Sequence, residues 1–272
     1  MQRAQIYQIF YSEETRNSLE SGFIPLENAN LRPDWYEYWV IRNFLLHQPL
    51  DEHVFYGFLS PKFSQKTGLG SSEVYKFLAT VPEQTDVVTF SPHFDAGALF
   101  GNVFLQGANE HPNAWQVFVE SARFMAPGVN LDTLLMDSSN TVFCNYFVAK
   151  PRFWRHWFNR AELIFQIAEQ NASPLGHALN GGTRHSNSES PTKVFVIERL
   201  VSLLLATDSR WQVKSFNSMA LPLVYPNANR VAHELVMLDA LKKAAVATGQ
   251  GEYMNVFASL RSRVFAEMAA QR

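Results

Sequence analysis

The chain has 272 residues, of which 47% are hydrophobic and 14% aromatic, and its formal net charge is −2. This composition is sufficient for a large core, whereas the lack of a basic stripe argues against nucleic acid as a partner. The single cysteine, Cys144, excludes an intramolecular disulfide framework, and no apolar run approaches the roughly 18 residues of a membrane span. Residues 1–8 carry no apolar segment typical of a signal peptide, so we expect a cytoplasmic protein.

Segments typical of strands alternate with segments typical of helices over residues 1–160. This alternation predicts an α/β fold, in which helices flank a mixed, Rossmann-like sheet and further helices follow at the C-terminus. The expected strands are residues 5–11, 54–59, 86–90, 141–149 and 212–216. The expected helices are residues 34–46, 71–80, 96–106, 111–125, 152–168, 193–206, 230–248 and 252–270. We expect loops at 22–32 and at 173–192, the second of them mobile because it is rich in Gly, Ser, Asn and His.

A six-residue phrase occurs twice, each time where a predicted strand ends. The copies are Phe-Leu-Ser-Pro-Lys-Phe at 58–63 and Thr-Phe-Ser-Pro-His-Phe at 89–94. Proline cannot donate to a sheet ladder, and ligands usually bind at the carboxyl ends of strands in open α/β sheets. The repeat therefore predicts that two strands bring a hydroxyl and a basic group to one edge, although two ordinary turns would give the same pattern. The residues concerned are Ser60 and Lys62 in the first copy and Ser91 and His93 in the second.

An isolated acidic and basic pair, Glu198 and Arg199, lies within the largely apolar run at 194–205. Glu198 and its neighbour Arg199 are costly to bury unless they are paired or partly hydrated. Partial burial raises the pKa of a carboxylate toward neutral pH, which suits a catalytic base. The alternative is that both residues belong to the polar stripe of an amphipathic helix.

The established cofactor motifs are missing from this sequence. There is no GxGxxG, GxxxxGK[ST], HExxH, CxxC or GxSxG, and the eight histidines show no zinc-ligand spacing. One further polar residue stands out, because Asn145 interrupts the apolar run at 141–149. A buried amide must bond either to the backbone or to a ligand, so Asn145 is a candidate binding residue.

Five segments, in their order and spacing, resemble glycosyltransferases of the GT-A type, in particular domains of bacterial capsule and surface-polysaccharide biosynthesis. They are QIYQIFYSEET, DWYEYWVIRNFL, FYGFLSPKF, CNYFVAKPRFWRHW and FVIERLVSLLLA, and they cover most of residues 5–216. The resemblance implies one GT-A-like domain over 1–272, with a nucleotide-binding half at 1–110, an acceptor half at 111–216 and a helical extension at 217–272. It also implies a nucleotide-sugar donor and a saccharide acceptor as partners.

The resemblance assigns a role to each candidate residue. Tyr7, Gln8 and Tyr11 would flank the nucleotide base, and Ser60 and Lys62 would approach the ribose or phosphates. The nucleotide-sugar site would also include Ser91, His93, Asp95 and Asn145, and Glu198 would be the base of an inverting transfer. We therefore expect Tyr7, Lys62, His93 and Glu198 to share one cavity.

The sequence departs from the family where GT-A enzymes carry an Asp-x-Asp metal motif. It has Ser91-Pro92-His93 there, with Asp95 two residues beyond. A single carboxylate binds Mg²⁺ or Mn²⁺ poorly unless phosphates and waters complete the shell. Two alternatives follow: a metal-independent enzyme whose departing diphosphate is held by Lys62, His93 and Arg184, or a domain that has lost catalysis. If the enzyme does use a metal ion, Asp95 is the residue expected to hold Mg²⁺ or Mn²⁺.

The sequence is compatible with two other functions. A non-catalytic binding or scaffolding protein of surface-polysaccharide assembly would use its aromatic residues for core and interface, with the two C-terminal helices forming a homodimer seam. A glycoside hydrolase would need two facing acids, for which Asp95 and Glu198 are the candidates. No spacing in the sequence supports that pair, so the hydrolase ranks last.

Overall fold

The computed structural model describes residues 3–28, 31–111, 113–185 and 188–270, with the backbone alone at 184, 185 and 188. The strands of its main sheet are β1 (Arg3–Phe10), β2 (Ile24–Glu27), β3 (Val54–Leu59), β4 (Val87–Thr89), β5 (Phe147–Ala149) and β8 (Val213–Ser215). They lie in the order β2-β1-β3-β5-β4-β8. Neighbouring strands are parallel except at β5, which runs antiparallel to both β3 and β4.

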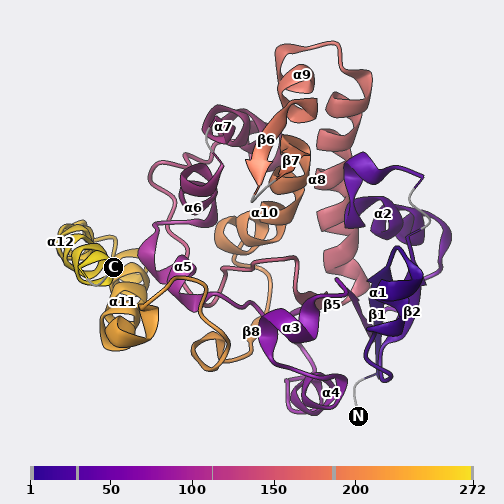
Figure 1. The fold of residues 1–272 in the computed structure, drawn as a ribbon, viewed down its shortest axis with the longest axis horizontal. Coiled ribbons are helices and arrows are strands. Elements are labelled where there is room, and N and C mark those ends of the chain that lie inside the picture. Colours follow the sequence, from indigo (N-terminus) through magenta and orange to yellow (C-terminus); the bar gives the residue numbers. More distant parts are fainter. Residues whose placement is uncertain (1–2, 29–30, 112, 186–187, 271–272) are drawn as a thin grey trace.

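Helices pack on both faces of this sheet (Figure 1). The strands alternate their side chains between the two faces, so that Tyr56 of β3 belongs to one core cluster and Phe55 to the other. On the Tyr56 face lie α2 (Glu37–His47), α6 (Val103–Glu110), α7 (Ala114–Met125), α8 (Pro151–Gln170), α9 (Pro174–Asn180) and α10 (Thr192–Thr207). On the Phe55 face lie α3 (Phe63–Thr67) and α4 (Ser71–Leu78).

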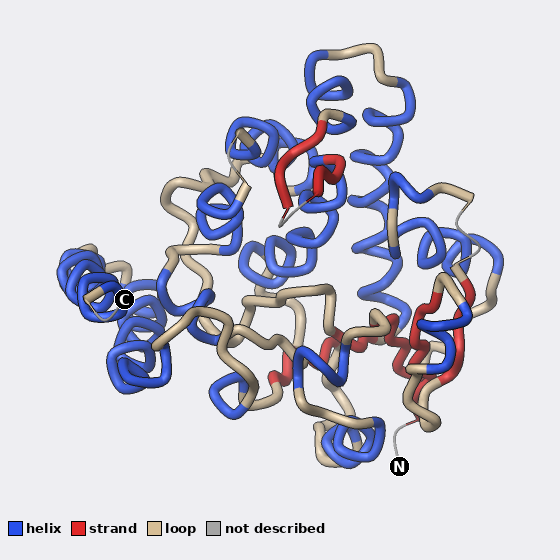
Figure 2. The backbone as a smooth tube through the Cα atoms, in the orientation of Figure 1, coloured by secondary structure: helices blue, strands red, loops and turns tan. Residues whose placement is uncertain are grey.

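A third group of helices stands to one side of the sheet. It consists of α5 (Phe94–Leu99), α11 (Ala232–Thr248) and α12 (Glu252–Ala269), which share their own apolar cluster (Figure 1). A separate hairpin of β6 (Gly182–His185) and β7 (Ser188–Pro191) lies apart from the main sheet, as the strand colours of Figure 2 show. The remaining short elements are α1 (Glu13–Asn17) and the 3₁₀ helices η1 (Pro33–Trp35), η2 (Ser218–Ala220) and η3 (Ala228–Val231).

This architecture confirms the expected α/β class, a mixed six-stranded sheet flanked by helices that is compatible with a Rossmann-like fold. The strand predicted at 54–59 has the bounds of β3. Close packing of this strand depends on Gly57, because a Cβ there would lie 2.8 Å from Cγ2 of Val148 on β5. Among the described residues, no helix combines the length and apolar character needed to span a bilayer.

Five sequence expectations were wrong in detail. The helix expected at 96–106 is split into α5 and α6, because Asn102 caps the start of α6 through the N–H groups of Phe104 and Leu105. The loop expected at 22–32 contains β2, which pairs with β1 through backbone hydrogen bonds rather than through a strong apolar pattern. The mobile loop expected at 173–192 is instead α9 followed by the β6–β7 hairpin. The helix expected at 34–46 begins only at Glu37, and the strand expected at 141–149 begins only at Phe147. The last two differences shape the candidate site.

Candidate functional site

A cleft lies at the edge of the sheet where β1 and β3 end and β5 begins. It has an inner cavity of about 190 Å³ and an outer cavity of about 460 Å³. The two cavities adjoin, because Tyr36, Glu37, Ser60 and Lys66 line both. The inner cavity is further lined by Trp35, Tyr38, Phe58, Cys144, Asn145, Ser190, Phe195 and Glu198, and the outer cavity by Tyr11, Asn28, Pro61 and Lys62.

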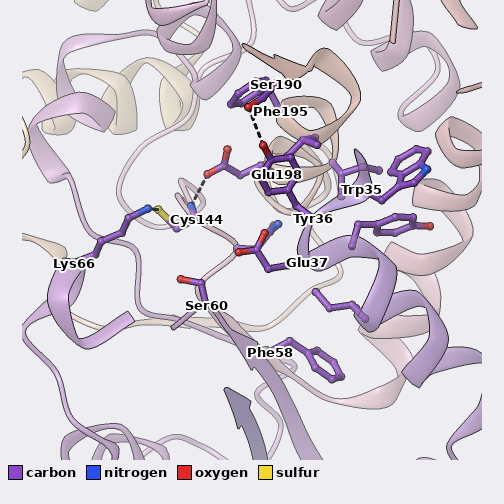
Figure 3. Close-up of a pocket in the computed structure, with 15 residues that line it drawn as sticks. Trp35, Tyr36, Glu37, Phe58, Ser60, Lys66, Cys144, Ser190, Phe195 and Glu198 are labelled. Atoms are coloured by element: carbon purple, nitrogen blue, oxygen red, sulfur yellow. Dashed lines mark hydrogen bonds between the residues drawn. The ribbon is translucent and has the colours of Figure 1, made fainter. Parts of the chain in front are cut away.

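A break in the backbone directs two residues into this cleft. Tyr36 has φ 47° and ψ −131°, a conformation that costs energy for a residue with a Cβ, and it separates η1 from α2. Its hydroxyl group lies 3.0 Å from the Ser190 hydroxyl on β7, so Tyr36 reaches across the inner cavity to the hairpin (Figure 3). Glu37, the next residue, begins α2 with its side chain in the cleft.

Ion pairs hold η1 in the position that this break requires. The Asp34 carboxylate accepts a hydrogen bond from Lys193 Nζ of α10 at 2.6 Å, and Lys193 also lies 4.3 Å from the centre of the Trp35 ring. Trp35 Nε1 donates to Glu169 of α8 at 2.9 Å. Burial raises the pKa of Asp34, but the hydrogen bonds from Arg32 and Lys193 outweigh it and bring the pKa to about 2. A charged, anchored η1 therefore supports the strained residue beside it.

A tight turn before β5 forms another wall of the cleft. Cys144 and Asn145 both adopt the left-handed conformation, with φ 61° and 54°. The turn is fixed from outside, since the N–H of Phe143 donates to Ser91 Oγ at 3.0 Å and the N–H of Cys144 donates to Glu198 Oε1 at 3.0 Å. Asn145 Oδ1 is a buried atom without a hydrogen-bond partner among the described residues. It is thus an acceptor that a bound ligand can satisfy.

Glu198 lies on α10 and lines the inner cavity, and its Oε1 atom is engaged by the N–H of Cys144 (Figure 3). Its side chain is 30% exposed, and its Oε2 atom is 3.7 Å from Arg199 Nη1. Arg199 itself is buried and donates to the carbonyl oxygens of Val103 and Phe195. The two neighbours therefore do not form a common polar stripe: Arg199 packs inward while Glu198 lines the cleft.

Two lysines supply positive charge at the junction and in the outer cavity. Lys66 of α3 lies between the cavities, and its ammonium group is 3.2 Å from Cys144 Sγ. Burial lowers the pKa of Lys66, but Cys144, Glu198 and Glu37 together raise it above its ordinary value. Lys62 is exposed and lines the outer cavity. The outer cavity can therefore attract an anion.

Burial governs the titration of two acidic groups in the cleft. It raises the pKa of Glu37, and the nearby charge of Glu198 raises it further. It also raises the pKa of the Cys144 thiol to about 11, so Cys144 stays protonated at neutral pH and is a poor nucleophile.

The structure brings five of the sequence-predicted residues to the cleft. Tyr11 and Lys62 line the outer cavity, Ser60 lies at the junction, and Asn145 and Glu198 line the inner cavity. Arg184 was a further candidate, and its side chain lies outside the described residues.

Two predicted residues of β1 support the cleft without lining it. The Tyr7 ring packs against Phe44 of α2 at 4.7 Å between centroids. Gln8 is buried, where Oε1 accepts from the N–H of Glu20 at 2.8 Å and Nε2 donates to the carbonyl of Ser60 at 3.4 Å. Neighbouring side chains of a strand point to opposite faces of the sheet. Tyr7 therefore packs against α2 on one face while Gln8 is buried on the other, and neither lines the outer cavity.

The second copy of the repeated phrase has a structural role. Ser91 fixes the turn at Phe143, and His93 is a left-handed residue that precedes α5 and lines a separate small cavity. Burial lowers the pKa of His93. Asp95 is fully buried, and its carboxylate accepts from the N–H groups of Val224 and Tyr225 at 2.7 to 3.1 Å. Tyr7, Lys62, His93 and Glu198 therefore do not share one cavity, because only Lys62 and Glu198 line the cleft.

These contacts also bear on metal binding. Within the described ranges, no group of three or more His, Cys, Asp and Glu residues is placed to hold a metal ion. The carboxylate of Asp95 is occupied by backbone N–H groups, so it does not present free oxygens to a cation in the cleft.

Comparison with known proteins gives no family for this chain: no family model, no curated protein and no solved structure matches it. Function is therefore inferred from the cleft. Two residues at its centre, Glu37 and Lys66, carry no motif in the sequence. For Glu37 the sequence shows only a charged residue near the start of a helix rich in aromatic residues. Charged residues are equally common on solvent-exposed helix faces, so this feature does not indicate a binding site.

Proposed function

We propose that this protein is a glycosyltransferase that moves a sugar from a nucleotide-sugar donor to a saccharide acceptor, with a fold of the GT-A type. The observation that carries the proposal is the division of charge along one cleft. Lys62 lies at the outer cavity, Lys66 and Glu37 lie at the junction, and an aromatic inner cavity carries the carboxylate of Glu198. A nucleotide-sugar has the same division, with an anionic diphosphate between a base and a sugar.

The chemistry follows from this placement. Glu198 accepts the proton of an acceptor hydroxyl through Oε2, the oxygen that is free of the Cys144 N–H. The acceptor oxygen forms the new bond to the anomeric carbon as the bond to the diphosphate breaks, and the departing oxygen takes the bonding electrons. Lys62 and Lys66 stabilise the negative charge on the leaving group, in the role that a metal ion has in other enzymes.

The first prediction concerns donor binding. A nucleoside diphosphate should raise the melting temperature by an amount that grows with its concentration, because it binds the folded state only. A thermal-shift series with UDP, GDP, CMP and their sugars measures this, and Lys66→Ala should reduce the response while exposed Lys76→Ala on α4 should not. Unchanged melting temperatures across the whole series would contradict the proposal.

The second prediction separates catalysis from binding. Glu198→Gln keeps the hydrogen bond from Cys144 but removes the base, so transfer should fall by about 10² to 10⁴-fold while donor affinity and melting temperature stay close to wild type. Radiolabelled sugar transfer to a panel of acceptors measures the rate. Full transfer activity in the variant would exclude Glu198 as the base.

A second candidate function is a non-catalytic binding or scaffolding protein. One observation favours it: Glu198 already has a structural partner in the turn at Cys144. A further one is the exposed apolar surface of α11 and α12, where Val236, Met237, Val246 and Val256 are each at least 41% exposed and suit a homodimer seam. On this alternative the protein would bind sugar ligands, show no transfer with any donor, and sediment as a dimer.

A further inference from the structure

The inner cavity offers hydrogen-bond acceptors more readily than donors. Asn145 Oδ1 has no partner among the described residues, and Glu198 Oε2 has only a 3.7 Å contact with Arg199. The Glu37 carboxylate accepts a hydrogen bond from its own backbone N–H, and among the described residues none from another side chain. A ligand that fits this cavity must therefore bring donors, as the hydroxyl groups of a sugar do.

The charges of the inner cavity also favour a neutral ligand that carries hydrogen-bond donors. Two of its lining residues, Glu37 and Glu198, are acidic, and among the described lining residues Lys66 alone is basic. The ammonium group of Lys66 lies against Cys144 at the junction with the outer cavity, where a diphosphate would also use it. Arg199 gives its hydrogen bonds to backbone carbonyls instead. A negatively charged group in the inner cavity would face two carboxylates, of which Glu198 lies 3.7 Å from the buried Arg199, and one ammonium group placed at the junction.

From this arrangement we propose that Glu37 is a specificity-determining residue that selects donors with a neutral sugar and rejects donors whose sugar carries a carboxylate. The inference rests on the proposed function in taking the ligand to be a nucleotide-sugar. Glu37 is suited to this role because it lines both cavities (Figure 3). It is also the first residue of α2, and the preceding segment η1 holds the start of that helix in place. Glu198 lines the same cavity, but its Oε1 atom already accepts a hydrogen bond from the N–H of Cys144 in the turn before β5.

The experiment compares donors that differ only at C6, as CH₂OH or as carboxylate. UDP-glucose is compared with UDP-glucuronate, and GDP-mannose with GDP-mannuronate, by titration calorimetry on the full chain. Wild type should bind the neutral member about tenfold more tightly or better. In Glu37→Gln the ratio should narrow to about threefold or less, because one of the two repelling charges is gone. The ratio is the readout, since any change in phosphate binding affects both members equally.

The matched control is Glu267→Gln, which removes the same charge from an exposed site on α12 and should leave the ratio at its wild-type value. Equal or tighter binding of the uronates to wild type would overturn the inference, as would an unchanged ratio in Glu37→Gln.

If no nucleotide-sugar binds, the proposed function fails by itself. Saturation-transfer NMR with methyl glucoside and methyl glucuronoside, on wild type and Glu37→Gln, then decides the inference. A wild-type preference for the neutral sugar that weakens in the variant supports it. Equal signals, no signal, or a preference that the substitution leaves unchanged overturns it.

Discussion

At the scale of single residues, Glu37 shows how local burial can tune a binding site. Its carboxyl group lies where the two cavities meet, and burial together with the charge of Glu198 raises its pKa. A hydrogen bond from its own backbone N–H and the charges of Lys66 and Lys62 lower the pKa of Glu37, but they do not outweigh burial. The carboxylate therefore takes up a proton at a higher pH than an exposed glutamate does.

The third prediction is a pH dependence of donor binding that comes from Glu37. As the pH falls through its raised pKa, Glu37 becomes neutral and ceases to repel the diphosphate, so affinity should increase. Calorimetry with UDP-glucose over a series of decreasing pH values measures this, because the diphosphate of that donor is a diester that keeps its charge throughout. Glu37→Gln should bind with little pH dependence, and an equally steep dependence in that variant would assign the effect to another group.

At the scale of elements, the segment η1 has more influence on the cleft than its three residues suggest. Asp34 is held by Lys193 of α10, and Trp35 by Glu169 of α8. These partners lie more than a hundred positions away in the chain, so the position of Tyr36 and Glu37 depends on two distant helices. The Lys193 side chain is 2% exposed and that of Arg32 is 29% exposed, so among the ion pairs of η1 the one between Lys193 and Asp34 is the more buried.

The fourth prediction tests that link. Lys193→Met should lower the free energy of unfolding by about 1–3 kcal/mol, because it leaves Asn180 Oδ1 short of a donor while Asp34 keeps Arg32. Urea denaturation measures the loss, and donor affinity should fall with it as η1 loosens. The control is Arg155→Met, whose ion pair with Glu52 is 55% exposed on both sides and should cost less than about 1 kcal/mol. Similar losses in the two variants would mean that burial of the pair is unimportant.

At the scale of the whole molecule, one buried lysine adds to the apolar cluster and to the Asp239–Ser138 hydrogen bonds that join the C-terminal helices to the rest of the protein. Lys242 of α11 donates to the carbonyl oxygens of Gly97, Phe100 and Met136 at 2.6 to 3.0 Å. Gly97 and Phe100 belong to α5 and the residue after it, and Met136 belongs to the loop after α7; all three are more than 100 residues from Lys242 in the sequence. A single ammonium group therefore connects α11 to α5 and to the loop that follows α7.

The fifth prediction is that this link is essential for stability. Lys242→Met should cost about 3 kcal/mol or more, because three carbonyl groups lose their donor in a buried place. Its neighbour provides the control: Lys243 is 46% exposed, and Lys243→Met should cost less than about 1 kcal/mol. Thermal and urea unfolding of both variants measure the difference. Equal stability of the two variants would contradict the role given to Lys242.

Much of the fold was visible in local sequence patterns. The strand at β3 and the helices α8, α10 and α12 follow from apolar runs and helical periodicity. Such patterns involve only neighbouring residues, so they can be recognised without knowing which distant residues are in contact. β2 escaped detection because a short edge strand needs little apolar character of its own.

The candidate site was only partly predictable, for a reason that its residues make clear. Ser60, Lys62 and Glu198 were found because strand ends and charges within apolar runs are visible in a single chain. Asp95 and His93 carried the same signals, yet their surroundings gave them structural roles. A polar residue in a strong pattern can serve the backbone or a ligand, and the pattern alone does not distinguish these uses.

The sequence by itself determined the alternation of strands and helices and the Ser-Pro ends of two strands, because these depend on neighbouring side chains. The tertiary structure decided where the cleft lies and what lines it. The break at Tyr36 is held by bonds to β7 and, through Asp34, to α10, and the turn at Cys144 is held by Glu198. Such strained backbone is stable only when partners far away in the chain hold it, and no local pattern encodes those partners.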